Sequence, residues 1–343
     1  MRAITCTGYG DPDHVLRLDD IDEPTVAVDQ VLVEVHAASI NPADWHLIRG
    51  VPFIARLQIG LRRPPFTVPG SDFAGRVIAV GTSVTRVGVG DDVFGCTFMA
   101  GFGAFAERVA VAEHLVARMP ERLGYDEAAA IPLAALTALH ALRDHGRLEA
   151  GHRVLVIGAS GGVGGFAVQI AKALGAEVTG VCSTSNVELV RSLGADRVVD
   201  YTAPDAWHEV GHHDLILQLG GAQRASACRR LLTPRGTLLQ LSGDSDNRWF
   251  GPIGRVIAGR ALAAFVKQTI TTFTVAPNAD DLDRLARFSD DGALRVSIDA
   301  PYPLARAADA VRHLESGHGP GKVLLQTTDA HAPRPTAPLP SKR

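Results

Sequence analysis

The chain has 343 residues, 46% of them hydrophobic, which is enough for about two domains that each bury a core. Its formal net charge of −3 is nearly balanced, so nothing points to nucleic acid or an anionic membrane surface as a partner. The four cysteines are widely scattered, which argues against a zinc knuckle or a disulfide scaffold and favours reduced, mostly buried thiols in a cytoplasmic protein.

Residues 1–125 show the pattern of a β domain. The first residues contain no apolar run typical of a signal peptide, which agrees with a cytoplasmic location. Short apolar runs such as residues 30–36 and 75–80 are separated by clusters of Gly, Pro and Asp. Because these runs follow one another too closely for helices between them, we expect a sheet or barrel connected by loops.

The most apolar stretch of the chain covers residues 128–142. It contains Pro132 and His140, and it is shorter than a bilayer requires. We therefore expect a buried helix here and no membrane partner.

From about residue 150, short apolar runs alternate with amphipathic stretches, which predicts a doubly wound α/β sheet. After Arg153 at its start the first run is wholly apolar, as in a strand buried on both faces of a parallel sheet. The expected strands are residues 153–157, 177–182, 197–199, 213–219, 236–241 and 270–275. The expected helices are residues 166–174, 187–193, 222–232 and one that begins at the N-cap Asn278.

The end of the chain holds one more expected strand and a tail. Residues 321–326 predict the strand, and the sequence leaves open whether it returns to the first domain. Residues 328–343 are rich in Pro, Ala and Thr without an apolar period, so we expect a disordered tail.

A glycine-rich segment, Gly158 to Gly165, lies directly between an expected buried strand and an amphipathic helix. Glycine allows a sharp turn and a close approach to a pyrophosphate, and the helix N-terminus offers unpaired N–H groups. No Gly-Lys-Ser/Thr follows, which argues against a P-loop, and a turn that only packs the helix tightly is the remaining alternative. The residues predicted to hold the pyrophosphate of a dinucleotide are Gly158, Ala159, Ser160, Gly161, Gly162, Val163 and Gly164.

The choice between NAD and NADP depends on the end of the second strand of such a sheet. An acidic residue there would bind a ribose 2′-hydroxyl and repel a 2′-phosphate. This strand instead continues with Ser-Thr-Ser-Asn at residues 183–186, and no carboxylate occurs before Glu188, which favours NADP(H). These residues could also serve as the cap of the next helix, and the two roles are compatible. The candidate phosphate-binding residues in this turn are Ser183, Thr184 and Asn186.

Several motifs together resemble the medium-chain dehydrogenase/reductase superfamily, in its quinone oxidoreductase-like branch. The resemblance runs from Met1 to about Gln326. Besides the glycine-rich segment, its markers are residues 35–45 (VHAASINPADW), 69–75 (PGSDFAG), 90–95 (GDDVFG), 130–138 (AIPLAALTA) and 193–201 (LGADRVVDY).

The resemblance implies a fold and an assembly. It implies a GroES-like β-barrel domain over residues 1–125, completed by residues 300–327, and a Rossmann dinucleotide-binding domain over residues 126–299. It also implies an active site in the cleft between the two domains and a homodimer formed through edge strands of two Rossmann sheets.

The zinc enzymes of this superfamily use Cys, His and a further Cys, Asp or Glu as catalytic ligands, and this chain departs from that pattern. Asn41 stands at the place of the first ligand, and Ser71 replaces the His of the Gly-His-Glu motif. The four-Cys structural lobe is missing, since Cys96 stands alone in its region. His36 and His46 are nearby, but a lone His in a strand or loop is more often a hydrogen-bonded structural residue. We therefore expect no metal site.

The resemblance also implies roles for individual residues. In the zinc-free branch, the residues that match Asn41 and Thr137 line the nicotinamide pocket, and the Tyr that matches Tyr201 helps to bind the adenosine 2′-phosphate. A Lys or Arg often accompanies that Tyr, and Ser185 at one such place weakens the preference for NADP(H). At the carboxyl edge of the sheet, further predicted cofactor contacts are Gly220, Ser242 and Gly243.

The expected reaction is a hydride transfer to a small electrophilic substrate, in which negative charge develops on oxygen. Hydrogen-bond donors can stabilise that charge and solvent can supply the proton, so no strong catalytic acid is required, and none is evident. Asn41, Trp45 and His46 lie on the segment expected to face the substrate, and they are the predicted catalytic residues. Trp45 can pack on a flat ring, although a role as a core or hinge aromatic is an equal alternative.

The sequence thus predicts a zinc-independent oxidoreductase that transfers hydride from NADPH to a quinone or an activated alkene. An NADP-dependent carbonyl reductase or alcohol dehydrogenase is the alternative within enzymes, but an isolated carbonyl gains most from the missing zinc. A redox sensor that binds NADPH with little turnover is the alternative of another class, because its phosphate-binding segment would be the same.

Overall fold

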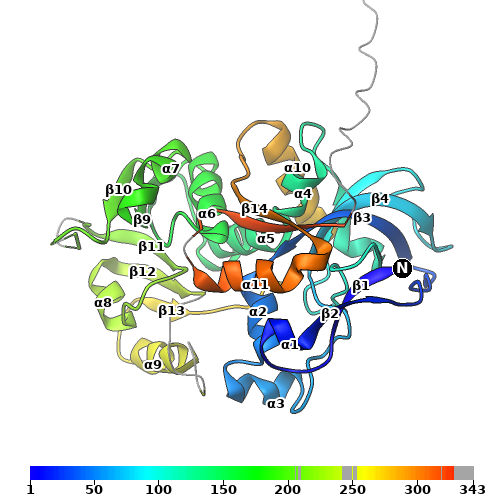
Figure 1. The fold of residues 1–343 in the computed structure, drawn as a ribbon. Coiled ribbons are helices and arrows are strands. Elements are labelled where there is room, and N and C mark those ends of the chain that lie inside the picture. The colour runs from blue at the N-terminus through cyan, green and yellow to red at the C-terminus, as the bar shows by residue number, and fades with distance from the viewer. Residues whose placement is uncertain (205, 208–209, 242–248, 250–252, 318, 328–343) are drawn as a thin grey trace, which may run out of the picture.

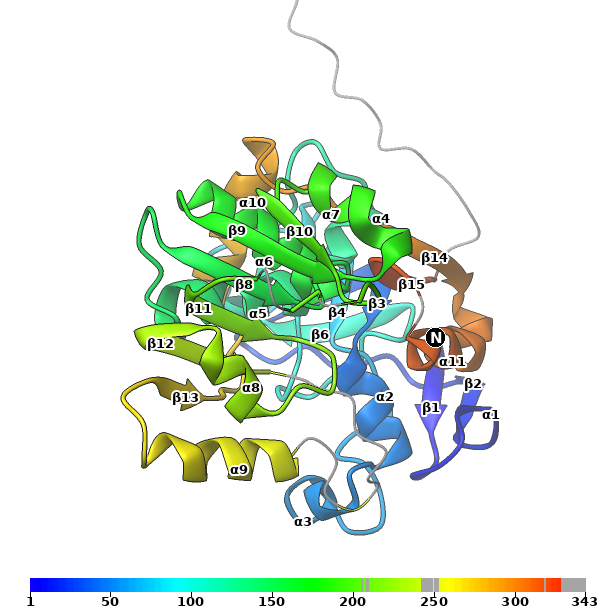
Figure 2. The ribbon, with the colours of Figure 1, turned by 90° about the vertical axis from the view of Figure 1, so that its left-hand side faces the viewer.

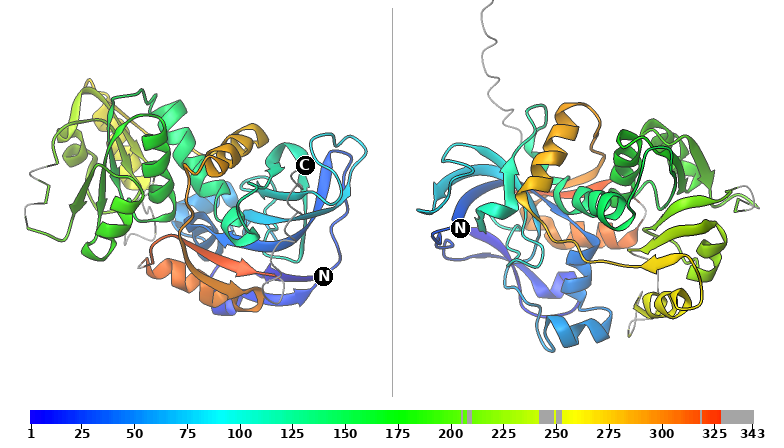
Figure 3. Two further views of the ribbon diagram at one scale, coloured as in Figure 1. Left: turned by 90° about the horizontal axis from the view of Figure 1, so that it is seen from above. Right: turned by 180° about the vertical axis from the view of Figure 1, so that it is seen from behind.

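The computed structural model describes residues 1–204, 206–207, 210–241, 249, 253–317 and 319–327. Its two main sheets lie at opposite ends of the molecule, one in green and yellow and the other in blue, cyan and red (Figure 3). Two predictions fall outside the described residues: the cofactor contacts Ser242 and Gly243, and the disordered tail at residues 328–343.

Six parallel strands form the doubly wound sheet that the alternating pattern predicts (Figure 2). The strand order is β10-β9-β8-β11-β12-β13, so the chain starts inside the sheet, winds to one edge and then crosses to the other. The strands are β8 Arg153–Ile157, β9 Glu177–Cys182, β10 Arg197–Asp200, β11 His213–Gln218, β12 Leu232–Gln240 and β13 Thr269–Thr271. The helices of this half are α6 Gly162–Ala173, α7 Val187–Ser192, α8 Ala225–Arg230, α9 Ile253–Ala263 and α10 Ala279–Asp290.

Strand β8 shows why a wholly apolar run predicts a strand that is covered on both faces. Val154 and Val156 belong to the core beside α6, whereas Leu155 and Ile157 belong to a second core beside α8. All four side chains are at most 3% exposed. Because side chains alternate along a strand, neither face of this sheet meets water here.

The last strand of this sheet is shorter than predicted. The sequence pattern predicts a strand over residues 270–275, but only Thr269–Thr271 pair with β12. Val275 is buried in the core beneath α10, so the apolar pattern at this end reflects packing under the helix. Asn278 caps α10 as predicted, because its side chain accepts a hydrogen bond from the N–H of Asp281 at 2.8 Å.

The second main sheet has the order β14-β15-β3-β4-β5-β7, and β6 also pairs with β3. Its strands are β3 Gln30–Ile40, β4 Asp72–Val80, β5 Asp92–Cys96, β6 Arg108–Ala112, β7 Val116–Arg118, β14 Ile298–Pro303 and β15 Lys322–Gln326, with α11 Ala307–Ser316 between the last two. The pair β1 Arg2–Cys6 and β2 Leu16–Asp20 forms a small third sheet. Strand β15 runs antiparallel to β3, with Val323 opposite Ile40 (Figure 1). The strand at residues 321–326 therefore pairs with a strand of the first 125 residues, which the sequence left open.

Helices interrupt the first 125 residues, which corrects the expectation of strands joined only by loops. They are α1 Pro12–Val15, α2 Pro42–Arg49 and α3 Arg56–Ile59. The signals for α2 are local, since Asn41 is its N-cap and Pro42 its first residue. Asp44 accepts a hydrogen bond from the N–H of Asn41 at 2.7 Å, and Gly50 ends the helix with a φ of 64°. A search for apolar runs alone does not detect so short a helix between two strands.

The apolar stretch at residues 128–142 is buried, as predicted, but it is divided between two helices. They are α4 Tyr125–Ala129 and α5 Pro132–His140, and a π-helical turn, Ala141–His145, follows α5. The division falls at Pro132, because proline lacks the N–H that a continuous helix would use there. Within the described residues, no helix has the length and apolar character needed to span a membrane. All four cysteines are free and buried, as predicted.

Candidate active site

The glycine-rich segment forms a tight turn between β8 and α6. Gly158 has a φ of +90°, and a Cβ at Gly164 would lie 2.0 Å from the carbonyl oxygen of Gly158, so both positions require glycine. Gly161 is the N-cap of α6 and provides no side-chain hydrogen bond. The first N–H groups of the helix, including those of Gly162 and Val163, therefore lack a side-chain partner from the cap. This arrangement fits the pyrophosphate of a dinucleotide.

The turn after β9 lies against the glycine-rich segment. Ser183 precedes a 3₁₀ turn, Thr184–Asn186, that leads into α7. The Asn186 amide donates hydrogen bonds to the hydroxyls of Ser160 and Ser183, both at 3.2 Å, and Ala159 is fully buried. The Asn186 side chain thus links Ser160, a predicted pyrophosphate contact, to Ser183, a predicted 2′-phosphate contact.

Asp200 is a candidate residue that the linear sequence does not reveal. Strand β10 pairs with β9 so that Asp200 lies opposite Cys182, the last residue before the turn. Hydrogen bonds from the hydroxyls of Thr184, at 2.6 Å, and Thr202, at 2.7 Å, hold the pKa of Asp200 below its usual range. An acidic residue at the end of β9 would suit a ribose 2′-hydroxyl. Asp200 instead ends the neighbouring strand β10, and both of its carboxylate oxygens already accept hydrogen bonds from threonine hydroxyls. Tyr201, beside it in the chain, is 53% exposed.

Two more predicted cofactor residues are Gly220, in the loop after β11, and Thr137, on helix α5. A Cβ at Gly158 would lie 3.3 Å from the backbone nitrogen of Gly220, so the loops after β8 and β11 adjoin at the carboxyl edge of the sheet. Thr137 on α5 donates its hydroxyl hydrogen to the carbonyl oxygen of Leu133 at 2.6 Å. The N–H of Leu133 donates to Asp72 at 3.0 Å, which links α5 to the second sheet.

A buried polar cluster surrounds Asn41, and we call Asn41, Asp44, Ser71, Asp72 and Lys322 the Asn41 cluster. The Asn41 Nδ2 donates to Asp72 at 2.9 Å, and the Asn41 Oδ1 accepts from the Lys322 ammonium at 2.5 Å. The Ser71 hydroxyl donates to Asp44 at 3.2 Å, and the Lys322 Nζ lies 3.8 Å from an Asp72 oxygen. Each of the five residues is at most 4% exposed.

Burial controls the ionisation of this cluster. It raises the pKa of Asp44 to about 7, opposed by the hydrogen bond from the Asn41 N–H and assisted by the Asp72 charge. Burial also raises the pKa of Asp72, and the Lys322 ammonium opposes that rise. The pKa of Lys322 is lowered by burial, against the effect of the two carboxylates. The cluster therefore combines a Lys322–Asp72 ion pair with an Asp44 carboxyl whose protonation changes near neutral pH.

Trp45 and His46 follow Asn41 on α2 but have other partners. Their rings stack with centroids 3.7 Å apart, and Trp45 packs, partly buried, against the core of the second sheet. The His46 Nδ1 lies 3.1 Å from the carbonyl oxygen of Val51, and burial lowers the pKa of His46. Both side chains are thus held by packing, and their catalytic roles stay predictions.

Comparisons with known proteins agree with this arrangement. Residues 27–121 match the alcohol dehydrogenase GroES-like domain, and residues 193–325 match a zinc-binding dehydrogenase family. The chloroplast envelope quinone oxidoreductase homolog of Arabidopsis thaliana is 30% identical over 95% of this chain and 98% of its own length. The chain belongs to the medium-chain dehydrogenase/reductase superfamily, in its quinone oxidoreductase-like branch.

Two further members of the superfamily are similar over nearly the whole chain. The chloroplastic NADPH-dependent alkenal/one oxidoreductase of Arabidopsis thaliana is 32% identical over 95% of this chain and 79% of its own length. The solved quinone oxidoreductase of Coxiella burnetii has a TM-score of 0.84 at 29% identity and covers 96% of this chain and 99% of its own.

The residues of this member of the superfamily do not fit a catalytic zinc ion. Asn41 and Ser71 stand at two of the ligand places, and neither an amide nor a hydroxyl is a good zinc ligand. The Lys322 ammonium lies among them, where its charge would repel the metal. In the part of the chain that the structure describes, no group of three or more His, Cys, Asp and Glu side chains could hold a metal ion.

Lys322 is the member of the Asn41 cluster that the sequence analysis missed. It lies 281 residues from Asn41 and reaches it only because β15 pairs with β3. Asp44 and Asp72 lie in motifs that carry the resemblance, yet no local pattern indicates that both carboxyls are buried. One signal is present in the sequence: Lys322 is a lone charge in the apolar run 321–326, and a charge on a buried strand requires a partner.

Proposed function

We propose that this protein transfers hydride from NADPH to a quinone or an activated alkene, such as an enone or enal, without a metal ion. The observation that carries the proposal is the Asn41 cluster, which provides hydrogen-bond donors and an ammonium where zinc enzymes of the superfamily bind their metal. The relatives named quinone oxidoreductase and alkenal/one oxidoreductase support this substrate class. In both kinds of substrate the charge spreads to an oxygen remote from the attacked carbon, so hydrogen bonds can replace a Lewis acid.

The cofactor in this proposal is NADP(H), which supplies hydride from its nicotinamide ring when it is bound. The turn from Gly158 to Gly164 and the N-terminus of α6 hold its pyrophosphate. Thr137 and Gly220 line the nicotinamide end of the site. The proposed contacts of the adenosine 2′-phosphate are Ser183, Thr184, Asn186 and Tyr201.

Asn41 acts in this proposal on the charge that the substrate develops. One Nδ2 hydrogen of Asn41 is donated to Asp72, and the second has no partner among the described residues. We assign the second hydrogen to a ligand oxygen, where it stabilises negative charge as hydride reaches the electron-poor carbon. Trp45 and His46 border the substrate on the same helix. Solvent supplies the proton that completes the reduction.

A homodimer, a cytoplasmic location and a division into two domains belong to the same proposal. Strand β13 is an edge strand of the six-stranded sheet, and Ile257 and Phe265 near it are 58% and 86% exposed, which supports pairing of two such edges. The four free cysteines support a reducing compartment. The two main sheets support a catalytic domain of residues 1–125 and 300–327 and a dinucleotide-binding domain of residues 126–299.

A turnover assay on the purified protein tests the proposed function. NADPH and then NADH are mixed with quinones, enones and simple aldehydes in the presence of EDTA, and the absorbance of the reduced nicotinamide is followed. We expect quinones or enones to oxidise NADPH at a rate that chelation does not change. Activity that is confined to aldehydes and abolished by EDTA would overturn the proposal, and so would NADPH binding without turnover of any electrophile.

A further inference from the structure

Lys322 connects the Asn41 cluster with the glycine-rich segment. It is the first residue of β15, drawn in red in Figure 1, and it is only 4% exposed. Its ammonium donates hydrogen bonds to the Asn41 Oδ1 and to the carbonyl oxygen of Ile40, and it lies 3.8 Å from Asp72. A buried ammonium is unfavourable unless it is paired, so these contacts keep the charge in place.

The same contacts determine which way round the Asn41 amide lies. The oxygen and the nitrogen of an Asn side chain have nearly the same shape, so packing alone does not distinguish the two flips. An ammonium only donates hydrogen bonds, and a carboxylate only accepts them. The amide oxygen of Asn41 must therefore face Lys322, and its nitrogen must face Asp72. This orientation of the amide also fixes the direction of the second Nδ2 hydrogen.

The stem of Lys322 and the residue before it contact the glycine-rich segment. A Cβ at Gly162 would lie 2.9 Å from the Cδ of Lys322. The N–H of Gly321 donates to the carbonyl oxygen of Ser160 at 3.3 Å, and Gly161 forms an isolated parallel bridge with Gly321. The side chain that orients the amide is thus held against the turn proposed to bind the pyrophosphate.

We propose that Lys322 is a positioning residue for hydride transfer. Its ammonium, together with Asp72, holds the Asn41 amide so that one Nδ2 hydrogen faces the reacting ligand. This inference rests on the proposed function, because it concerns the same site. Two other roles of Lys322 lead to different results: direct binding of the cofactor phosphates, and an ion pair that only stabilises the fold.

The experiment compares Lys322→Met, Asn41→Ala and the double variant with the wild type. Met keeps most of the Lys stem but cannot donate a hydrogen bond, and Lys322→Gln, which keeps a neutral donor, is made in case the Met variant does not fold. Lys172→Met is the matched control, because Lys172 lies in the last turn of α6, away from the glycine-rich segment, and pairs with Asp196. We measure kcat and KM with the best electrophile of the panel, the Kd of NADPH by calorimetry, and the Tm.

We expect Lys322→Met and Asn41→Ala each to lower kcat by roughly 100- to 1,000-fold, as the loss of an oriented donor does in other enzymes. The double variant should be no slower than Asn41→Ala, because Lys322 acts through that side chain. Lys322→Gln should retain more activity than Lys322→Met. We expect the Kd of NADPH to change by less than about threefold and Lys172→Met to behave as the wild type.

Several results would overturn the positioning role. If the losses multiply in the double variant, Lys322 acts independently of Asn41. If the Kd of NADPH rises enough to account for the whole loss in kcat/KM, Lys322 binds the cofactor phosphates. If the Tm falls while kcat is preserved, the ion pair only stabilises the fold.

A second measurement does not require turnover. Selective ¹⁵N labelling of Asn side chains gives two Nδ2 hydrogen resonances for Asn41, which are identified by their loss in Asn41→Ala. We expect the Asn41 Nδ2 hydrogen that is donated to Asp72 to exchange slowly with solvent in the wild type, and at least about tenfold faster in Lys322→Met. An exchange rate that is the same in the wild type and in Lys322→Met would overturn the positioning role. If the exchange rate changes as expected but the wild type turns over no electrophile, only the proposed function is overturned.

Discussion

Asp44, Asp72 and Lys322 show at the residue scale what burial does to an ordinary charged side chain. Each is nearly inaccessible to water, and desolvation disfavours every charge. The pKa values of the two carboxyls therefore rise and that of the ammonium falls. The attraction between the ammonium and the carboxylates opposes these shifts, and so do the hydrogen bonds that the carboxylates accept. Asp44 is the residue whose protonation changes near neutral pH.

Replacing Asp44 with Asn should make the stability of the protein less sensitive to pH. The folded-state pKa of Asp44, about 7, lies above its unfolded value, so its protonated form stabilises the fold fully below about pH 4. This contribution is lost as the pH rises through 7. Relative to Asp44→Asn, the free energy of unfolding of the wild type should fall by up to about 4 kcal/mol over this window. Chemical denaturation at several pH values measures the difference, and a difference that does not vary with pH would contradict the prediction.

At the element scale, the turn between β8 and α6 contains glycines with different requirements. A Cβ at Gly164 would lie 2.0 Å from the backbone oxygen of Gly158, whereas a Cβ at Gly161 would meet nothing nearer than 3.5 Å. Glycine at position 164 is needed to form the turn. Glycine at position 161 keeps the space in front of the N-terminus of α6 open, where phosphates bind.

Gly164→Ala should therefore destabilise the protein, whereas Gly161→Ala should not. A methyl group against a backbone carbonyl forces the chain to shift, for which we expect a loss of about 2–4 kcal/mol in the free energy of unfolding. Gly161→Ala should stay within about 0.5 kcal/mol of the wild type but weaken NADPH binding at least about tenfold. Denaturation and calorimetry test the pair. Equal stability of the two variants would refute the assignment.

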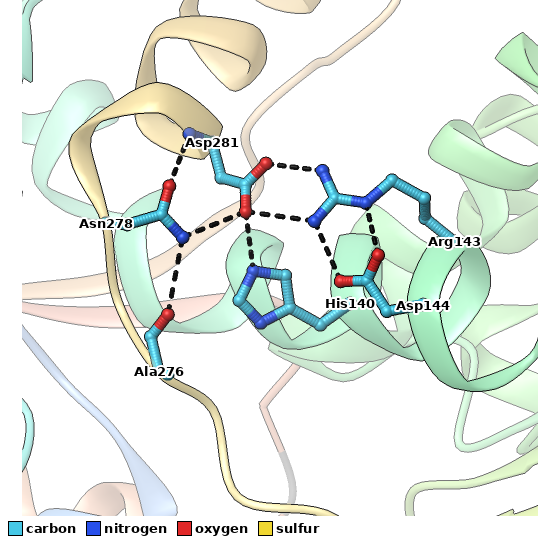
Figure 4. A network of polar contacts seen from close by, with 6 residues as sticks. All are labelled: His140, Arg143, Asp144, Ala276, Asn278 and Asp281. Carbon is cyan, nitrogen blue, oxygen red and sulfur yellow. Dashed lines mark hydrogen bonds and ion pairs between the residues drawn. The ribbon is translucent and has the colours of Figure 1, made fainter.

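A second feature at this scale is a partly buried polar network that joins the end of α5 and the π-helical turn after it to α10 (Figure 4). Asp281, in the first turn of α10, accepts hydrogen bonds from Arg143 and Asn278, and His140 lies 2.9 Å from it. Burial by itself raises the pKa of Asp281, but these contacts outweigh it and hold the pKa well below the usual range. Arg143 also pairs with Asp144. The network is the polar part of the contact between the two helices.

Asp281→Asn should lower the free energy of unfolding by about 2 kcal/mol at neutral pH. Because the folded-state pKa of Asp281 is depressed, its contribution is present above the unfolded value of about 4 and is lost as the pH falls. The effect of the substitution should therefore shrink in acid. Asp283→Asn is the control on the same helix, where Asp283 pairs with the more exposed Arg86, and it should cost less than about 1 kcal/mol. Equal losses in the two variants would exclude a special role of the buried network.

At the scale of the whole molecule, a strand from the far end of the chain joins the two halves of the site. Strand β15 lies between β14 and β3 in the second sheet, and the residues at its start contact the glycine-rich segment of the first. A dinucleotide that bound at this junction would contact both halves at once. Its binding free energy would therefore stabilise the molecule as a unit.

NADPH should raise the Tm of the protein, and it should do so at lower concentration than NADH. A ligand present at 100 times its Kd adds about 2.7 kcal/mol to the free energy of unfolding. Tyr201→Ala should reduce the shift with NADPH more than the shift with NADH, because the exposed ring is proposed to contact the 2′-phosphate end. Thermal unfolding with each cofactor over a concentration series measures this. Identical shifts with the two cofactors would contradict the proposed preference.

The sequence by itself determined the features whose signals lie between neighbouring residues. The unit of β8, the glycine-rich turn and α6, the cap of α10 at Asn278 and the buried stretch 128–142 all depend on hydrophobic period and capping, which act over one or two turns. Helix α2 is not among the predicted elements although its local signals, the cap at Asn41 and Pro42, are present, because the apolar runs around it indicate only strands. The strand predicted over residues 270–275 is too long, because an apolar run does not show which surface will cover it.

Only the tertiary structure decided which charges meet at the site. Lys322 reaches Asn41 through the pairing of β15 with β3, and Asp200 reaches Thr184 through the pairing of β10 with β9. Strand pairing brings together residues at any separation in the chain, so no local pattern contains it. The protonation of Asp44 depends on burial by the complete fold. The sequence therefore determined that the glycine-rich segment forms a phosphate-binding turn. The fold decided the electrostatic surroundings of Asn41, because the charged side chains lose their water only once the core has formed.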